Sequence, residues 1–240
     1  MDGLESVLLL AEEWELELGP RLENTNEAVV HLTSDAVLRV DLYDNATFEE
    51  RVAVLQAADG CGYARLLRHD VERRAMLLER LEPFAATVED VQRALVDAWR
   101  VETDYPLRTA ADKARELAQF IEEYWQHFDR PTPRAKVERA LELCESRAAA
   151  WDPADAVVVH GDAHTHNVLR RANGELAFID PEPFRCERAY DVAVALRMGG
   201  DANGQPRAVQ EWHFIERLST GLQCLRLGYH DLARDLFDDS

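Results

Sequence analysis

The sequence contains no run of apolar residues that approaches the length of about 18 needed to cross a membrane as a helix. Its first six residues, Met-Asp-Gly-Leu-Glu-Ser, lack the positive charge of a signal peptide, and we expect none. No CxxC pair is present, because the four cysteines are scattered: Cys61, Cys144, Cys186 and Cys224. This spacing argues against a disulfide framework or a structural zinc site. We therefore expect reduced thiols and a cytoplasmic protein.

Positive charge is scarce: 27 Lys and Arg residues stand against 46 Asp and Glu residues, a formal net charge of −19. We expect no nucleic-acid partner, because phosphate backbones are bound by clustered Lys and Arg. The acidic excess is compatible with a cationic small-molecule substrate, which a negative cleft would concentrate. The simpler interpretation is an acidic surface that keeps the protein in solution, and net charge alone leaves both open.

No internal repeat, low-complexity tract or long linker interrupts the 240 residues, a length that suits one large domain or two small ones. Strands are predicted at residues 28–33, 36–41, 63–68 and 74–80, with a helix at 47–58. From Thr87 onward the pattern becomes helical, and Thr87-Val88-Glu89-Asp90 resembles a capping box. Apolar spacing predicts further helices near 110–128, 137–144 and 209–227. The expected boundary between the two parts lies at Glu82-Pro83.

The most informative run of the chain is His-Gly-Asp-Ala-His-Thr-His-Asn at residues 160–167. Asp162 stands two residues after His160 and five before Asn167, which is the His-x-Asp-x-x-x-x-Asn spacing of a kinase catalytic loop. A short apolar strand at 156–159 precedes the run. Strands at 168–170 and 176–179 flank Asn173-Gly174, a type I′ hairpin signal, and lead to Asp180. The hairpin predicts that Asn167 and Asp180 converge, and their oxygen atoms suit a hard cation such as Mg²⁺.

These residues resemble the aminoglycoside phosphotransferase family, part of a wider kinase-like group that includes choline kinases. The family pattern is His-Gly-Asp-x-x-x-x-Asn, then a hydrophobic-Asp pair, then a Tyr-Asp that enters a helix. This sequence has His160 to Asn167, Ile179-Asp180 and Tyr190-Asp191 in those places. Residues 75–81 resemble the segment that leads into the interlobe hinge of the family. Residues 211–221 resemble a C-terminal helix of its streptomycin-kinase-like branch.

The resemblance implies a two-lobed, protein-kinase-like α+β fold. A small antiparallel sheet with one helix would bind the nucleotide in residues 1–82, and a larger, mainly helical lobe would carry catalysis and the substrate in residues 83–240. The implied reaction moves the γ-phosphoryl group of ATP or GTP to a hydroxyl of a small molecule, such as an aminoglycoside or related amino sugar, although the family label leaves the acceptor open. Asp162 would be the base, and Asn167 and Asp180 would hold Mg²⁺. Asp191 is expected to be structural, either capping its helix or binding loop amides.

The small lobe departs from the kinase pattern. Arg39 occupies the place of the strand lysine that usually contacts the nucleotide phosphates, and the two residues are not equivalent where geometry is tight. We choose Glu50 as its partner on the following helix, although strict register would place Arg51 there. The phosphate-covering loop expected at residues 23–27 has no glycine. The adenine is expected against the hinge, from Glu79 to Leu81.

Two alternatives remain open. The absent glycines and the Lys-to-Arg change suit a non-catalytic kinase-like binding protein, although such a protein need not keep Asp162, Asn167 and Asp180. The other alternative is a metal-dependent hydrolase, in which alternate residues share one face of an extended chain and bind zinc, manganese or iron. Its ligands would be His160, Asp162, His164 and His166. This second alternative leaves Asn167, the hairpin and Asp191 unexplained, whereas the kinase interpretation accounts for them.

Overall fold

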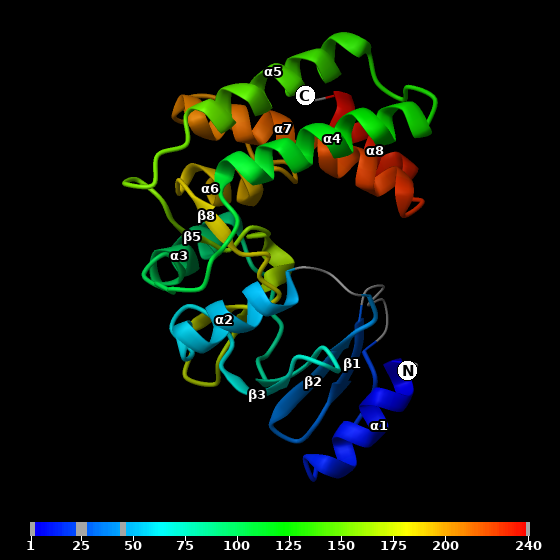
Figure 1. Cartoon of the computed structure of the whole chain (residues 1–240), viewed down its shortest axis with the longest axis vertical. Coiled ribbons are helices and arrows are strands. Elements are labelled where there is room, and N and C mark those ends of the chain that lie inside the picture. Colours follow the sequence, from blue (N-terminus) through cyan, green and yellow to red (C-terminus); the bar gives the residue numbers. More distant parts are fainter. Residues whose placement is uncertain (1–2, 23–27, 44–46, 239–240) are drawn as a thin grey trace.

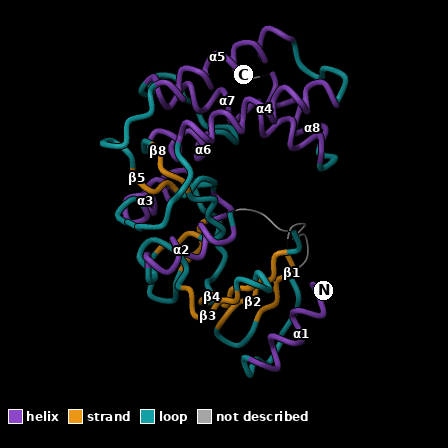
Figure 2. The backbone as a smooth tube through the Cα atoms, viewed as in Figure 1, coloured by secondary structure: helices purple, strands orange, loops and turns teal. Residues whose placement is uncertain are grey.

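A small sheet and a mainly helical part lie at opposite ends of the molecule (Figures 1 and 2), as seen in a computed structural model that describes residues 3–22, 28–43 and 47–238. The sheet is antiparallel, in the order β1 (Ala28–Leu32), β2 (Ala36–Asp41), β4 (Ala75–Glu79), β3 (Leu66–Asp70). Both predicted strand pairs are confirmed. They form one sheet because β2 pairs with β4, with Leu38 opposite Leu77. The loop expected at residues 23–27 lies outside the described residues.

The two faces of the sheet are covered by different helices. Helix α1 (Gly3–Glu13) is not among the elements predicted above; its buried Val7 and Leu10 pack in one cluster with Leu38 and Leu77. Helix α2 (Phe48–Ala58), which the sequence predicts, packs in another cluster with Met76 and Leu78. Successive side chains of a strand point to opposite faces, so β4 supplies apolar residues to both helices.

The rest of the chain is dominated by helices, among which α4, α5 and α7 lie together at the end remote from the sheet (Figure 1). Thr87 and Asp90 form the predicted capping box at the start of α3. The C-terminal helix α8 is not predicted; it packs on α7 at Gly221, where an added Cβ would lie 2.4 Å from the Phe237 ring. The helices are α3 (Val88–Ala98), α4 (Ala110–His127), α5 (Arg134–Ala149), α6 (Ala189–Leu196), α7 (Arg207–Arg226) and α8 (His230–Asp238).

Two short antiparallel strand pairs lie between the sheet and the helices. Strand β5 (Val157–Val159) pairs with β8 (Phe184–Cys186), and β6 (Val168–Arg170) pairs with β7 (Leu176–Phe178) after a 3₁₀ turn, η1 (Thr165–Asn167). The predicted β6–β7 hairpin is confirmed, but the type I′ turn is wrong. Of Asn173 and Gly174 only Gly174 has a positive φ, 90°, and its N–H donates to Arg171 O at 2.9 Å. The connection is therefore a longer loop closed by a left-handed glycine.

One hydrophobic cluster joins the two parts of the molecule. It contains Leu55 of α2, Leu95 of α3 and Phe178 of β7, so that the β6–β7 hairpin is packed between them. The expected α+β architecture is confirmed, whereas the boundary at residues 82 and 83 stays a prediction. Among the residues that the structure describes, no helix is both long and apolar enough to cross a membrane.

Candidate active site

Asp191, in the first turn of α6, fixes the backbone of the loop that follows β5. Its carboxylate accepts hydrogen bonds from the backbone N–H of His160 at 2.8 Å and of Gly161 at 2.9 Å, and from Trp99 Nε1 at 2.9 Å. Burial raises the pKa of Asp191 to about 6, although these three donors favour its ionised form. The predicted structural role of Asp191 is confirmed in the form of amide binding.

Gly161 allows the loop to lie directly against the segment after Asp180. Its φ is +83°, and a Cβ added to it would lie 2.0 Å from the carbonyl oxygen of Glu182. On the other side of the same contact, Glu182 N donates to His160 O at 2.8 Å. Only glycine satisfies both the left-handed backbone and this close approach.

His160 is a buried structural residue of this loop. Its Nδ1 accepts from Asp162 N at 3.1 Å, and its Nε2 lies 3.0 Å from Ile179 O. Burial lowers its pKa to about 4, so the ring is neutral near pH 7. Because both ring nitrogens are occupied, His160 cannot join His164 and His166 in binding a metal. The described part of the chain contains no group of three or more His, Cys, Asp or Glu side chains placed to hold one. The metal cluster of the hydrolase alternative is therefore wrong.

The Asp162 carboxylate is held by three neighbouring side chains. Its Oδ1 lies 2.6 Å from Arg197 Nη2, and its Oδ2 lies 3.2 Å from His164 Nε2. Asn167 Nδ2 donates to Asp162 Oδ2 at 3.1 Å and to its carbonyl oxygen at 3.0 Å. Burial alone would raise the pKa of Asp162, but the charge of Arg197 and the hydrogen bond from His164 outweigh it and hold that pKa well below its usual range. Asp162 is thus an oriented, ionised carboxylate at neutral pH.

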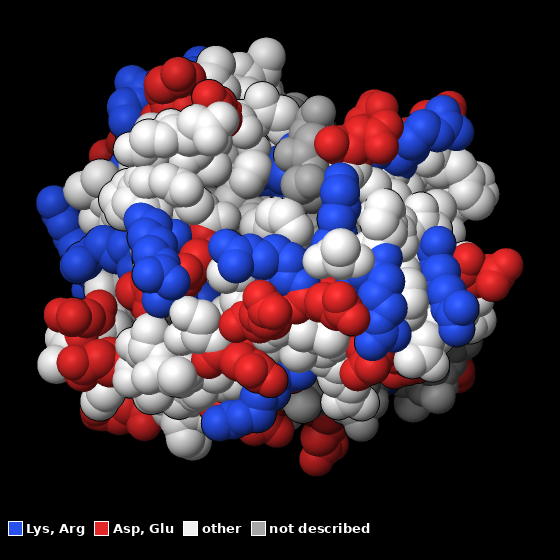
Figure 3. Space-filling view, turned by 90° about the horizontal axis from the view of Figure 1, so that it is seen from above, with Lys and Arg blue, Asp and Glu red and all other residues white. Residues whose placement is uncertain are grey.

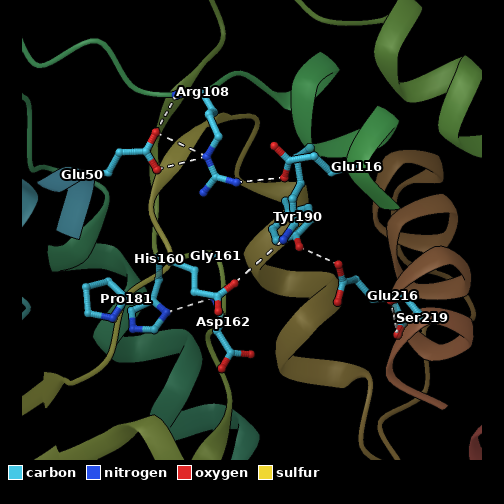
Figure 4. A network of polar contacts seen from close by, with 12 residues as sticks. Glu50, Arg108, Glu116, His160, Gly161, Asp162, Pro181, Tyr190, Glu216 and Ser219 are labelled. Atoms are coloured by element: carbon cyan, nitrogen blue, oxygen red, sulfur yellow. Dashed lines mark hydrogen bonds and ion pairs between the residues drawn. The ribbon is translucent and has the colours of Figure 1, made fainter. Parts of the chain in front are cut away.

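Arg197 connects Asp162 to the helical core. Its Nη1 lies 3.2 Å from Glu216 Oε2, and Tyr190 donates its hydroxyl proton to Glu216 Oε1 at 2.5 Å (Figure 4). Burial alone would lower the pKa of Arg197, but Asp162 and Glu216 together raise it, so the guanidinium stays charged. Tyr190 and Glu216 are themselves buried. The position of Asp162 is therefore set by a chain of contacts that ends in α7.

Asn167 and Asp180 lie at the two ends of the β6–β7 hairpin. Ile179 N donates to Asn167 O at 2.9 Å, which places the two segments side by side. Because Asn167 Nδ2 turns toward Asp162, its Oδ1 is left as an acceptor. Asp180 adopts a left-handed backbone with a φ of +57°, which Asp tolerates better than most residues. An amide oxygen and a carboxylate fit the preference of Mg²⁺ for oxygen ligands; that they share one ion stays a prediction.

Arg39 reaches from β2 to Asp180, as the kinase interpretation requires. Its Nη1 lies 2.9 Å from Asp180 Oδ2, and its Nε lies 2.7 Å from Asp41 Oδ1. Arg51 of α2 approaches the same two carboxylates, at 2.9 Å from Asp41 Oδ2 and 3.7 Å from Asp180 Oδ1. Arg39, Arg51, Asp41 and Asp180 therefore form one cluster of two positive and two negative side chains.

Glu50 is wrong as the partner of Arg39. Its carboxylate lies 3.0 Å from Arg108 Nε, and Arg108 Nη1 in turn lies 2.8 Å from Glu116 Oε2 (Figure 4). The residue that points from α2 toward Arg39 is Arg51, which the strict helix register favours. Because adjacent residues of a helix point about 100° apart, an offset of one position moves the side chain out of the site.

A cavity of about 590 Å³ lies between the sheet and the β6–β7 hairpin. Arg39, Arg51 and Asp180 line it together with the predicted hinge residues Glu79 and Leu81. The Glu79 carboxylate is already engaged, at 2.6 Å from Arg171 Nη2. The rest of the wall is mostly apolar: Val30, Leu32, Val37, Leu55, Ala64, Met76, Leu78, Leu169 and Ile179.

Comparison with known proteins identifies the family. Residues 21–226 match the phosphotransferase enzyme family. The chain belongs to this family. It is also 30% identical over 224 residues to streptomycin 6-kinase of Streptomyces griseus, an alignment that covers 85% of this chain and 70% of that protein. The expected family and the expected class, a kinase-type enzyme, are confirmed.

Solved structures show that the phosphotransferase shares its fold with small-molecule kinases. A choline/ethanolamine kinase family protein from Mesorhizobium loti superposes with a TM-score of 0.63 at 17% identity, covering 92% of this chain and 86% of that one. ADP-bound aminoglycoside phosphotransferase APH(2'')-Ib gives a TM-score of 0.62 at 14% identity, covering 97% and 96%. The two-lobed kinase-like fold is confirmed by these similarities.

Three residues of the phosphotransferase site are absent from the sequence prediction as site residues: Asp41, Arg51 and Arg197. A signal for Arg197 is present: it directly follows α6 with helical backbone angles and stands seven positions, about two turns, after Tyr190, on the same side. Both side chains contact Glu216. Asp41 follows Arg39 by two positions, so the two share one face of β2.

The distribution of charge on the surface of the phosphotransferase is relevant to the expected cationic substrate. Seen from above, the side of α5, basic side chains form a band among the acidic ones, and neither sign covers the face (Figure 3). On this face the net charge of −19 does not appear as a continuous acidic surface. The cationic character of the substrate stays a prediction.

Proposed function

We propose that this enzyme transfers the γ-phosphoryl group of a nucleoside triphosphate to a hydroxyl of a small molecule. The observation that carries the proposal is the ion pair between Arg39 and Asp180, 141 residues apart, at 2.9 Å across the cavity. This ion pair places Arg39, the strand residue expected to contact phosphate, against Asp180, the carboxylate expected to hold the metal. Asp162 and Asn167 are joined to each other on the adjoining loop. We assign nucleotide binding to residues 1–82 and acceptor binding to residues 83–240.

The apolar wall of the cavity suits the base of a nucleotide. The backbone N–H and C=O of Leu81 have no hydrogen-bond partner within the described chain, and Leu81 lines the cavity. A purine edge could supply those partners. The related APH(2'')-Ib is ADP-bound, which supports ATP as the donor; GTP is the other candidate.

The chemistry follows from the placement of Asp162. Its carboxylate accepts the proton of the acceptor hydroxyl, the hydroxyl oxygen forms a bond to the γ-phosphorus, and the bond from that phosphorus to the β–γ bridging oxygen breaks. Arg197 and His164 lower the pKa of Asp162, and a carboxylate of low pKa is a weak base. Asp162 therefore contributes mainly by orienting the hydroxyl, and it takes up the proton as the bond to phosphorus forms. Asn167 and Asp180 would hold Mg²⁺, which supplies positive charge to the phosphates.

The acceptor class is proposed from the streptomycin 6-kinase relative. An aminoglycoside or related amino sugar carries both hydroxyls and ammonium groups, and the acidic composition of the chain supports such a cationic substrate. A cytoplasmic location goes with this proposal, and the four unpaired cysteines support it.

The test is a turnover assay with ATP or GTP and Mg²⁺ against streptomycin, gentamicin, a macrolide and choline. Product is identified by mass, and nucleoside diphosphate release is measured in parallel. We expect a phosphorylated aminoglycoside, and loss of turnover in Asp162→Asn. Asp155→Asn, an exposed aspartate just before β5, is the matched control and should keep full activity. Nucleotide binding without turnover on any acceptor would instead support the non-catalytic alternative.

A further inference from the structure

We propose that Arg51 is a second phosphate-binding residue, and that Arg39 and Arg51 together form a two-arginine clamp for the phosphates of the donor nucleotide. The inference rests on the proposed function and extends it to two residues. Strict helix register places Arg51 at the position of the partner of Arg39, and the sequence pattern assigns no role to Asp41. The inference also changes the expected role of α2, which would supply a phosphate ligand instead of a carboxylate that orients one.

Asp41 sets the two guanidinium groups side by side. Its Oδ1 lies 2.7 Å from Arg39 Nε, and its Oδ2 lies 2.9 Å from Arg51 Nη1. The Asp41 side chain is only 2% exposed, so this carboxylate is not free to turn toward a ligand. In kinases a strand lysine is held by a helix glutamate. Here the orienting carboxylate comes from the strand itself, two residues after Arg39, and the helix contributes a second positive charge.

The two arginines of the clamp have unused hydrogen-bonding capacity. Arg39 and Arg51 both line it, and within the described residues the Nη2 atom of neither has a hydrogen-bond partner. Two arginines and Asp41 carry one net positive charge, which the carboxylate of Asp180 balances. Guanidinium groups bind phosphate through paired N–H donors, so a polyphosphate chain that enters beside Asp180 meets donors already in place.

Arg51 is also held in position independently of any ligand. Its Nε donates to Pro181 O at 3.1 Å, which ties α2 to the segment directly after Asp180. The Arg51 side chain is 5% exposed, so its position is defined by packing as well. A preorganised pair of cations loses little freedom on binding an anion. Because Asp180 balances the remaining positive charge of the cluster, we expect the phosphates to bind more tightly with Mg²⁺ than with EDTA.

The experiment compares three probes by calorimetry, with Mg²⁺ and with EDTA: ATP, inorganic tripolyphosphate and adenosine. In Arg51→Gln the Kd for ATP and for tripolyphosphate should rise about tenfold or more, while the Kd for adenosine stays unchanged. The Kd of Arg51→Lys for ATP and for tripolyphosphate should lie between those of wild type and Arg51→Gln, because lysine keeps the charge and loses the paired donors. Arg73→Gln is the matched control: Arg73 also bridges two carboxylates, Glu13 and Asp70, but lies outside the cavity and should leave all three affinities unchanged.

Stability must be separated from binding. Arg51→Gln leaves Asp41 with one partner fewer, so the double variant Asp41→Asn/Arg51→Gln is measured beside it, and thermal denaturation checks the fold of each. Equal tripolyphosphate affinity in folded wild type and Arg51 variants would overturn the clamp. If wild type binds tripolyphosphate through Arg51 but does not bind ATP, the clamp stands and ATP as the donor of the proposed function fails. If wild type binds no phosphate compound, both fail.

Discussion

Arg197 Nη2 lies 2.6 Å from Asp162 Oδ1, the shortest contact of the proposed catalytic carboxylate with its three side-chain partners. The pair joins the loop after β5 to the end of α6, and through Glu216 to α7. A carboxylate held this closely cannot rotate freely, so its orientation toward an acceptor hydroxyl depends on an arginine that sequence patterns for the loop do not include.

Replacing Arg197 by Gln should lower kcat about 100-fold while leaving the KM for nucleotide nearly unchanged, because Asp162 loses its orientation but the cavity is untouched. The pKa of Asp162 should rise toward its ordinary value, so the acidic limb of the kcat–pH profile should move to higher pH. Arg197→Lys should recover part of both effects. The measurement is a steady-state pH profile.

Arg147 offers the matched control for this prediction. It is a similarly buried arginine that contacts two carboxylates, Glu187 at 3.1 Å and Glu211 at 2.8 Å, away from Asp162. Arg147→Gln should lower the melting temperature without moving the pH profile. An identical shift of the profile in both variants would show that Arg197 acts only through general stability.

Gly161→Ala should abolish most activity and destabilise the protein, because its Cβ would meet the Glu182 carbonyl at 2.0 Å in addition to the strain of a positive φ. Gly174→Ala isolates the strain, since Gly174 has a φ of +90° and nothing within 4 Å of an added Cβ. It should cost about 1–2 kcal/mol of unfolding free energy and leave activity intact. Chemical denaturation and turnover of the two variants, compared side by side, check this; equal losses would refute the contact.

Asp191→Asn should destabilise the protein by about 1–3 kcal/mol, because an amide NH₂ would face one of the three N–H donors that now point at the carboxylate. The same change should lower turnover by loosening the loop at His160 and Gly161. Urea denaturation gives the free energy, and hydrogen exchange at the two loop amides reports the loosening. Unchanged protection of those amides would contradict the assigned role.

His160 should make stability fall as pH is lowered. Its pKa in the folded protein is about 4 against 6.5 for an ordinary histidine, so below pH 6.5 the unfolded chain binds the additional proton. The loss should amount to about 3 kcal/mol between pH 6.5 and 4. The raised pKa of Asp191, about 6, acts in the opposite direction across an overlapping range, since there the folded state binds the additional proton.

The contributions of His160 and Asp191 are separated by comparing how the unfolding free energies of wild type and two variants change with pH. The unfolding free energy of wild type minus that of His160→Gln should decrease from pH 6.5 to 4, and the corresponding difference for Asp191→Asn should increase. Both are measured by urea denaturation at several pH values. A difference for His160→Gln that does not vary with pH would mean that this histidine is not held neutral in the fold.

Local patterns were sufficient for most of the elements. Both strand pairs, α2, the α3 capping box and the β6–β7 hairpin follow from residue types and spacing over a few positions. Helix α1 was predictable too, since Val7, Leu10, Ala11 and Trp14 recur at helical spacing. The turn type at Gly174 was not, because the same Asn-Gly pair closes loops of different length and the flanking register decides between them.

The sequence by itself determined which family the chain resembles, which loop carries Asp162 and Asn167, and that Asp180 follows the next hairpin, because this spacing is a property of nearby residues. Only the tertiary structure decided what those residues contact. Arg39 is paired with Asp41 and not Glu50, Arg51 enters the cavity, and Arg197 binds Asp162 across 35 positions. Contacts of this kind depend on how helices and strands pack, and a shift of one helical position, about 100°, exchanges one side chain for its neighbour of opposite charge.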